Sequence, residues 1–145
     1  MSKPEAFIFD IDGTLADHNG VRSPYDETRV KYDRPIFPVF KVLNSLLANK
    51  YKVIFVSGRT EACREDTLQW IVDNSAFPSV NSITLFMRQV GDHRKDSIMK
   101  KEIYDTFIFP KYEVLGVFDD RMQVCRMLYE NNIFCFNVNQ GLKEF

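Results

Sequence analysis

The chain has 145 residues, of which 45% are hydrophobic and 27% are charged, and its net charge is −1. This length suffices for one domain with its own core, and the charge excludes a global basic field that would attract nucleic acid or membranes. No apolar run approaches the roughly 18 residues of a membrane span, and three cysteines without a C-x-x-C pair favour reduced thiols in the cytoplasm over a disulfide framework or a zinc site.

Five buried strands with helices between them are predicted along the chain. Residues 6–9 form a continuous apolar run rich in aromatic and branched side chains, which is typical of a strand buried on both faces. Similar runs predict strands at 52–56, 82–87, 114–118 and 133–138. Apolar side chains at helical spacing predict helices at 36–50, 62–74, 95–109 and 122–131.

Two of these helices have well-defined apolar faces. The face expected to be buried in the helix at 36–50 comprises Val39, Val42, Leu43, Leu46 and Leu47. The corresponding stripe in the helix at 95–109 comprises Ile98, Met99, Ile103, Tyr104 and Phe107. The segment 16–34 is polar and turn-rich, so it is expected to be a loop of about twenty residues, too short for a domain of its own.

This alternation of strands and helices predicts an α/β fold. We expect residues 1–145 to form one domain with a five-stranded parallel sheet between two layers of helices. In such sheets, ligands bind beyond the carboxyl ends of the strands. Polar and charged residues follow four of the predicted strands, at Asp10 and Asp12, at Ser57 and Arg59, at Arg88 through Lys95, and at Asp119 and Asp120. We expect these groups to meet at one edge of the sheet.

Asp10 and Asp12 are an unusual pair for the end of a buried strand. On a continuing strand both side chains would lie on the same side. Two like charges about 5 Å apart repel by roughly 3 kcal/mol at an effective dielectric constant of about 20. A bound cation or proton chemistry would offset this repulsion; the alternative is a solvated strand end in which Gly13 makes the turn.

The residues that follow the other strands complete a phosphate-transfer pattern. Adding Asp119 or Asp120 gives at least three carboxylates, which suit a hard cation, most simply Mg²⁺. Ser57, Arg59 and Lys95 would add a hydroxyl and positive charge. One carboxylate could attack phosphorus and the next could move the proton. The glycine spacing excludes a P-loop and a dinucleotide fingerprint, and no G-x-S-x-G elbow occurs.

Simpler roles remain open for several of these residues. Ser57 could be an ordinary turn residue, and Arg59 and Lys95 could be solvated charges at helix starts. The acidic pair Asp119 and Asp120 could cap a helix.

In chain order, these residues resemble the four motifs of the haloacid dehalogenase (HAD) superfamily of aspartate-nucleophile phosphatases. The matching residues are Asp10-Ile11-Asp12-Gly13-Thr14, Ser57, Lys95 and Asp119-Asp120. The resemblance implies a HAD-like fold in which Asp10 is the nucleophile and Asp12 the general acid and base. It also implies that Ser57 and Lys95 bind the phosphoryl group. Mg²⁺ would then be held by Asp10, the backbone carbonyl of Asp12, and the acidic pair.

Further stretches are similar to the phosphatase domain of phage-type polynucleotide kinase–phosphatases. They span residues 19–26, 56–59, 91–96 and 119–124. This resemblance implies that Arg22, Arg59 and Asp92 are needed for activity, as substrate-binding residues together with Thr14. It makes Asp120 the direct metal ligand of the acidic pair. The kinase half is absent, so we expect a free-standing phosphatase, and the pattern leaves open whether a separate kinase or ligase partners it.

The short insertions bear on the substrate. Many HAD relatives carry a cap domain after the first or third strand, but here these insertions are about twenty and about seven residues, too short for a cap with its own core. Together with this open site, the resemblance to polynucleotide phosphatases implies a Mg²⁺-dependent phosphatase for 3′-phosphorylated DNA or RNA ends. The alternatives are a phosphatase of nucleotides or other small phosphomonoesters, and a non-catalytic binding module.

Overall fold

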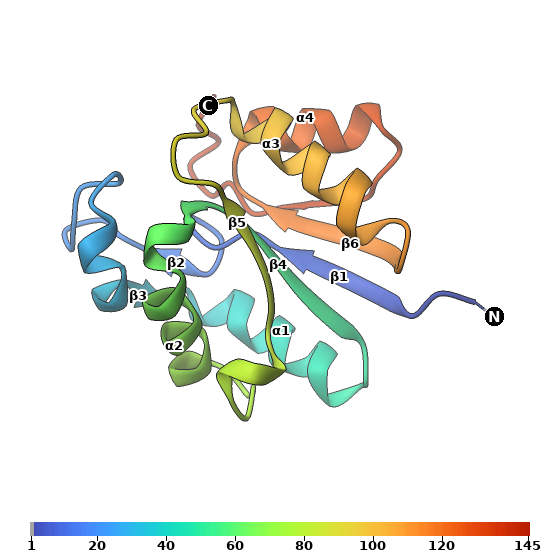
Figure 1. The fold of residues 1–145 in the computed structure, drawn as a ribbon, viewed down its shortest axis with the longest axis horizontal. Coiled ribbons are helices and arrows are strands. Elements are labelled where there is room, and N and C mark those ends of the chain that lie inside the picture. The colour runs from blue at the N-terminus through green and yellow to red at the C-terminus, as the bar shows by residue number, and fades with distance from the viewer. Residues whose placement is uncertain (1) are drawn as a thin grey trace.

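The computed structural model describes residues 2–145 and shows a five-stranded parallel sheet with helices on both faces (Figure 1). The strand order is β5-β4-β1-β6-β7. The strands are β1 (Glu5–Phe9), β4 (Lys52–Thr60), β5 (Thr84–Arg88), β6 (Glu113–Asp119) and β7 (Cys135–Asn137). The helices are α1 (Phe37–Ala48), α2 (Arg64–Asn74), α3 (Asp96–Ile103) and α4 (Met122–Glu130). The predicted α/β fold is confirmed. Within residues 2–145, no helix has the length and apolar character to cross a membrane.

The central strand β1 separates two cores. Successive side chains of a strand point to opposite faces, so Phe9 packs with Phe55 in the core on one face, whereas Ile8 packs with Ile54 in the core on the other. The side chains of Ile8 and Phe9 are both entirely buried. Burial on both faces explains the continuous apolar run at residues 6–9 of β1, and the carboxyl end of the strand is the next position where a charge can lie.

The predicted face of α1 was wrong at one position. Val42 is 43% exposed, whereas Phe40 and Leu43 are buried. The ring of Phe40 packs against Trp70 of α2, with their centroids 5.6 Å apart. This aromatic contact turns the helix so that position 42 faces outward.

The predicted stripe of α3 was also partly wrong, and here it missed a buried charged residue. Ile98 and Phe107 are about half exposed, at 52% and 51%. The buried positions of α3 include Met99 and Ile103 as expected, but also Lys100, which a search for apolar spacing passes over. Beyond Ile103 the helix widens into a π-helical turn, η4 (Tyr104–Ile108), which carries Phe107 off the buried face.

The insertion after β1 is more ordered than a loop. It contains β2 (Ala16–Asp17) paired antiparallel with β3 (Arg34–Pro35), and the 3-10 helix η1 (Glu27–Tyr32). It lies beside the carboxyl edge of the sheet (Figure 1). The Glu27 carboxylate accepts a hydrogen bond from the Thr60 backbone N–H at 2.8 Å, which ties η1 to the end of β4. As described over residues 2–145, the fold contains no cap domain.

Candidate active site

Three carboxylates meet where β1 and β6 end. Asp10, Asp119 and Asp120 each offer an oxygen, and these oxygens lie within 4.8 Å of one another. Asp10 and Asp119 are only 5% and 0% exposed. Burial, followed by the charge of Asp10, raises the pKa of Asp119 to about 6 and that of Asp120 to about 9. Three carboxylates crowded together at the sheet edge are the oxygen donor set that a hard divalent cation would bind.

Lys100 supplies the buried positive charge of this cluster. Its Nζ donates to Asp10 Oδ1 at 2.8 Å and to Asp119 Oδ2 at 2.7 Å, and its side chain is 1% exposed. Burial alone would lower the pKa of Lys100, but the charges of Asp10 and Asp119 outweigh it and hold the pKa well above its ordinary value. The ammonium group therefore stays charged beside two carboxylates.

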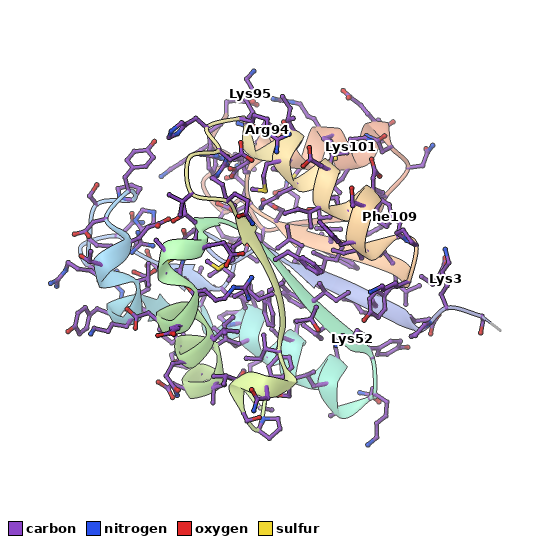
Figure 2. All side chains as sticks on the ribbon, viewed as in Figure 1. Lys3, Lys52, Arg94, Lys95, Lys101 and Phe109 are labelled. Carbon is purple, nitrogen blue, oxygen red and sulfur yellow. The ribbon has the colours of Figure 1, made fainter. Side chains whose placement is uncertain are left out.

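Lys95, predicted to bind the phosphoryl group, lies elsewhere. It is exposed at the residue that precedes α3, and Figure 2 shows its side chain directed outward. The position before a helix faces solvent here, whereas a residue one turn inside α3 faces the sheet. Lys100 thus occupies the place beside Asp10 that the motif assigned to Lys95.

The turn after β1 holds Asp10 and Asp120 in place. Thr14, predicted to bind substrate, is entirely buried and its hydroxyl donates to Asp10 Oδ2 at 3.0 Å, so it orients Asp10. Gly13 has a φ of +83°, and a Cβ at this position would lie 2.0 Å from Asp120 Oδ2. Glycine is therefore required both by the backbone angle and by the close approach of Asp120.

Asp12 lies outside the carboxylate cluster and faces two arginines. Its Oδ1 accepts from Arg22 Nη2 at 3.0 Å and from Arg59 Nη2 at 2.8 Å and Nε at 3.1 Å. Its side chain is 34% exposed. Among residues 2–145 no side chain or backbone group donates a hydrogen bond to Oδ2, so this oxygen is available to a bound molecule. The role of the Asp12 backbone carbonyl as a metal ligand stays a prediction.

Asp33 is a buried residue whose role the sequence pattern did not indicate. Its Oδ1 accepts from Arg22 Nε at 2.9 Å, and its Oδ2 accepts from Arg22 Nη2 at 3.0 Å and Arg59 Nη2 at 2.9 Å. The side chains of Arg22 and Arg59 are 0% and 2% exposed. Both arginines donate to Asp12 Oδ1 and so fix its position; their predicted role in substrate binding stays a prediction. Their charges are balanced by Asp33 and Asp12.

Replacing Asp33 with asparagine is expected to destabilise the fold by about 3–5 kcal/mol, because it leaves two buried guanidinium groups with one compensating carboxylate. Turnover should fall as well, since Asp12 loses its fixed support. Urea denaturation and a phosphatase assay measure the two effects. Asp73→Asn, an exposed change on α2, is the matched control, expected to stay within about 0.5 kcal/mol of the parent. Equal stability of the two variants would contradict the proposed role of the network.

Ser57 and the acidic residues near α3 complete the edge. Ser57 is entirely buried at the end of the predicted strand, and its Oγ accepts from the Arg59 backbone N–H at 3.0 Å. Asp92, predicted to be needed for activity, pairs with Arg94 at 2.8 Å in the turn before α3 and does not join the carboxylate cluster, so the structure gives no support to that prediction. Asp96, rather than Asp92, is the acidic residue near α3 that packs against β4.

Asp96 is held by charged partners from two other elements. It contacts Arg88 of β5, and Arg121 Nη1 lies 2.9 Å from its Oδ2. A Cβ at Gly58 would come within 2.9 Å of its carboxylate, so Asp96 packs directly against the irregular part of β4 that follows Ser57. The one-turn spacing from Asp96 to Lys100 on α3 is the sequence signal that could have identified both residues.

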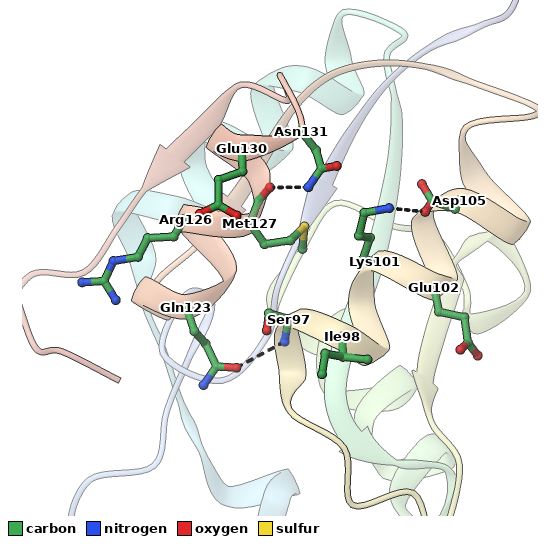
Figure 3. Close-up of a pocket in the computed structure, with 10 residues that line it drawn as sticks. All are labelled: Ser97, Ile98, Lys101, Glu102, Asp105, Gln123, Arg126, Met127, Glu130 and Asn131. Atoms are coloured by element: carbon green, nitrogen blue, oxygen red, sulfur yellow. Dashed lines mark hydrogen bonds and ion pairs between the residues drawn. The ribbon is translucent and has the colours of Figure 1, made fainter.

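A cavity on the outer side of α3 and α4 is unrelated to this chemistry. Its volume is about 620 Å³, and its lining residues are Ser97, Ile98, Lys101, Glu102, Asp105, Gln123, Arg126, Met127, Glu130 and Asn131 (Figure 3). Lys101 already pairs with Asp105 at 2.6 Å. None of the carboxylates at the ends of β1 and β6 lines it, so the candidate active site remains at the sheet edge.

The raised pKa of Asp120 predicts how pH changes stability. The folded carboxyl has a pKa of about 9 against an ordinary 3.8, so between these values the folded state binds a proton that the unfolded state releases. The free energy of unfolding of metal-free protein therefore falls as pH rises through this window. We expect a lower Tm at pH 9 than at pH 7 in EDTA, measured by differential scanning fluorimetry.

Asp120→Asn is the control for this pH dependence. Its metal-free Tm should change less between pH 7 and pH 9, because asparagine binds no titrating proton. A cation that displaces the proton should raise the Tm of the parent more at pH 9 than at pH 7. An identical change in Tm between pH 7 and pH 9 for parent and variant would contradict the raised pKa of Asp120.

Comparisons with known proteins agree with this geometry. A family model of the polynucleotide kinase PNKP phosphatase domain matches residues 4–142. A putative bifunctional polynucleotide kinase/RNA ligase of Autographa californica nuclear polyhedrosis virus is 36% identical over 146 residues, covering 98% of this chain and 20% of the viral protein. A chain in the structure of a Pnkp1/Rnl/Hen1 complex superposes with a TM-score of 0.85 and 39% identity, covering 94% of this chain and 45% of that one.

A more distant structure matches in fold alone. The class C acid phosphatase from Bacillus anthracis has a TM-score of 0.60 at 14% identity, covering 93% of this chain and 67% of the phosphatase. The chain spans less than half the length of the viral protein and of the chain in the repair complex. The similarity to them therefore concerns one portion of each.

Proposed function

This chain belongs to the family of polynucleotide kinase PNKP phosphatase domains, within the HAD superfamily, and we propose that it removes terminal 3′-phosphates from DNA or RNA. We further propose that residues 1–145 act as one phosphatase domain. The observation that carries the proposal is the buried Asp10 carboxylate, held between Lys100 and Thr14 beside two further carboxylates.

Asp10 is the proposed nucleophile. Its carboxylate oxygen forms a bond to phosphorus while the bond from phosphorus to the 3′ oxygen breaks, which gives an aspartyl phosphate. Lys100 and Thr14 fix the orientation of the carboxylate before the attack. Mg²⁺ held by Asp10, Asp119 and Asp120 would neutralise negative charge on the phosphoryl oxygens. Lys100 supplies a further positive charge beside Asp10.

Asp12 is the proposed general acid and base. With Oδ1 held by Arg22 and Arg59, Oδ2 is the oxygen free to carry a proton. It donates this proton to the departing 3′ oxygen and then takes one from the water that attacks the aspartyl phosphate. That second attack releases inorganic phosphate and restores Asp10. Ser57 supports this side of the site through the Arg59 backbone.

The open sheet edge favours a polynucleotide over a small substrate. The insertion after β1 lies beside the site and forms no cap, so a strand end can enter without a domain movement (Figure 1). Two relatives bear names of nucleic acid repair, a kinase/RNA ligase and a Pnkp1/Rnl/Hen1 complex. These names support a nucleic acid substrate here, and a kinase or a ligase as the partner that uses the product.

A panel of matched oligonucleotides tests the proposal. The ends compared are 3′-phosphate, 5′-phosphate and 2′,3′-cyclic phosphate on DNA and RNA, with mononucleotides and glycerol phosphate as small substrates. We expect Mg²⁺-dependent phosphate release from 3′ ends, abolished by EDTA. Good turnover of mononucleotides with none of any 3′ end would replace the proposal with a small-molecule phosphatase. No turnover of any substrate would favour a binding module.

A further inference from the structure

Tyr25 is an aromatic side chain without a structural role in the fold. It is 92% exposed, the highest value among the large hydrophobic side chains of residues 2–145. A tyrosine in that position contributes almost no burial to stability, since the hydrophobic contribution scales with the area removed from water. It belongs to the insertion beside the catalytic edge, so its ring is available to a molecule bound there.

The backbone that carries Tyr25 is firmly held. The Asp26 N–H donates to the Ser23 carbonyl at 3.0 Å, which closes a β-turn with Pro24 and Tyr25 at its two central positions. Proline at the first of these positions fixes its φ angle. The Asp26 carboxylate then caps η1 by accepting from the Thr28 N–H at 3.1 Å. Both ends of the turn are therefore fixed.

The same turn is connected directly to the proposed general acid. Arg22 Nη1 donates to the Pro24 carbonyl at 3.0 Å, while Nη2 of the same guanidinium donates to Asp12 Oδ1 at 3.0 Å. The planar guanidinium group of Arg22 therefore connects the turn that carries Tyr25 to Asp12 through two hydrogen bonds. The backbone that carries Tyr25 is thus held in place relative to Asp12.

The charges of the insertion suit a polyanion. Its acidic side chains all have partners within the chain. Asp17 pairs with Arg34, Asp26 caps η1, Glu27 accepts from Thr60 at the end of β4, and Asp33 is buried between arginines. Arg29 and Lys31 are exposed, and both lie over the ring of Tyr32, 5.0 and 5.4 Å from its centroid. Exposed aromatic rings among exposed cations are the surface on which single-stranded nucleic acids bind.

We propose that Tyr25 stacks on the base of an unpaired nucleotide at the 3′ end whose phosphate reacts with Asp10. The proposal rests on the proposed function and adds a residue that distinguishes a base-bearing strand end from other phosphomonoesters. Loss of one stacked base is expected to lower kcat/KM by about 5- to 150-fold. Stacking tolerates all four bases, so we expect little dependence on the identity of the terminal base.

The test compares Tyr25→Ala, Tyr25→Phe and Tyr129→Ala on two single-stranded oligonucleotide 3′-phosphates, identical except that one has an abasic terminal nucleotide. Tyr129, 82% exposed on α4, is the matched control because it lies outside the insertion. We expect Tyr25→Ala to lose activity on the base-bearing end, with most of the loss in KM, and a much smaller loss on the abasic end. Tyr25→Phe should retain the parent activity, since its ring stacks equally well.

The outcomes separate this proposal from the proposed function. Parent protein active on 3′ ends, with Tyr25→Ala equal to Tyr129→Ala, overturns the role of Tyr25 alone. An equal loss on base-bearing and abasic ends overturns stacking in favour of a structural effect. Parent protein that hydrolyses glycerol phosphate but no oligonucleotide end overturns the proposed function, and the role of Tyr25 with it.

Discussion

Asp10→Asn is expected to abolish turnover of every phosphomonoester, with a loss of at least about 10³-fold in kcat. The amide has nearly the same shape as the carboxylate, but it lacks the nucleophilic oxygen that forms the aspartyl phosphate. Release of inorganic phosphate from a 3′-phosphorylated oligonucleotide, measured at saturating Mg²⁺, gives the comparison. Circular dichroism and thermal melting establish that the variant folds.

Asp92→Asn is the matched control for this change. Asp92 pairs with Arg94 in the turn before α3 and does not join the carboxylate cluster. We expect its turnover to stay close to that of the parent. Residual activity of Asp10→Asn comparable to that of Asp92→Asn would contradict the covalent mechanism.

Lys100→Met is expected to reduce both the stability of the protein and its turnover. Without the ammonium group, Asp10 and Asp119 are left as buried like charges, so the metal-free protein should lose about 3–5 kcal/mol of unfolding free energy. Turnover should fall by at least about 10²-fold, since a charged donor beside the transferring phosphoryl group is lost. Methionine matches the length of lysine, which separates loss of charge from loss of packing. Urea denaturation in EDTA and a phosphatase assay give both values.

Lys95→Met makes the same chemical change at an exposed position. We expect it to stay within about 0.5 kcal/mol of the parent and to keep its turnover. Comparing these two variants shows whether Lys100, which lies beside Asp10 in the structure, or Lys95, which the motif suggests, is the lysine needed for turnover. Full activity of Lys100→Met with inactive Lys95→Met would reverse our assignment.

The strand ends explain why much of the site could be predicted. Buried parallel strands have apolar middle portions, so the charged residues at their carboxyl ends stand out, and the convergence of Asp10 with Asp119 and Asp120 followed from topology. Lys100 was missed because a buried lysine interrupts an apolar stripe, and hydrophobic spacing treats it as a surface residue. Its helical neighbours Met99 and Ile103 are buried and share its face.

The arginine network could not be predicted for a different reason. Asp33 contacts Arg22 and Arg59, which lie 11 and 26 residues away along the chain. Nothing in the local pattern distinguishes Asp33 from a solvated loop residue, because its burial is created only when the insertion folds onto α2. Trp70 of α2 donates to the Asp33 carbonyl at 2.9 Å, which fixes that packing.

The same network of Asp33, Arg22 and Arg59 connects Asp12 to the insertion after β1, a segment with little core of its own. Within η1 only Val30 is buried, so the insertion has almost no core and depends on Asp33 and its arginines for its place. Segments of this kind open as separate cooperative units at a lower free energy than the whole domain. Each such opening releases Asp12 while the sheet remains intact. Heating is therefore expected to inactivate the enzyme before the domain melts, with amide hydrogen exchange in residues 22–33 rising in step with the loss of activity.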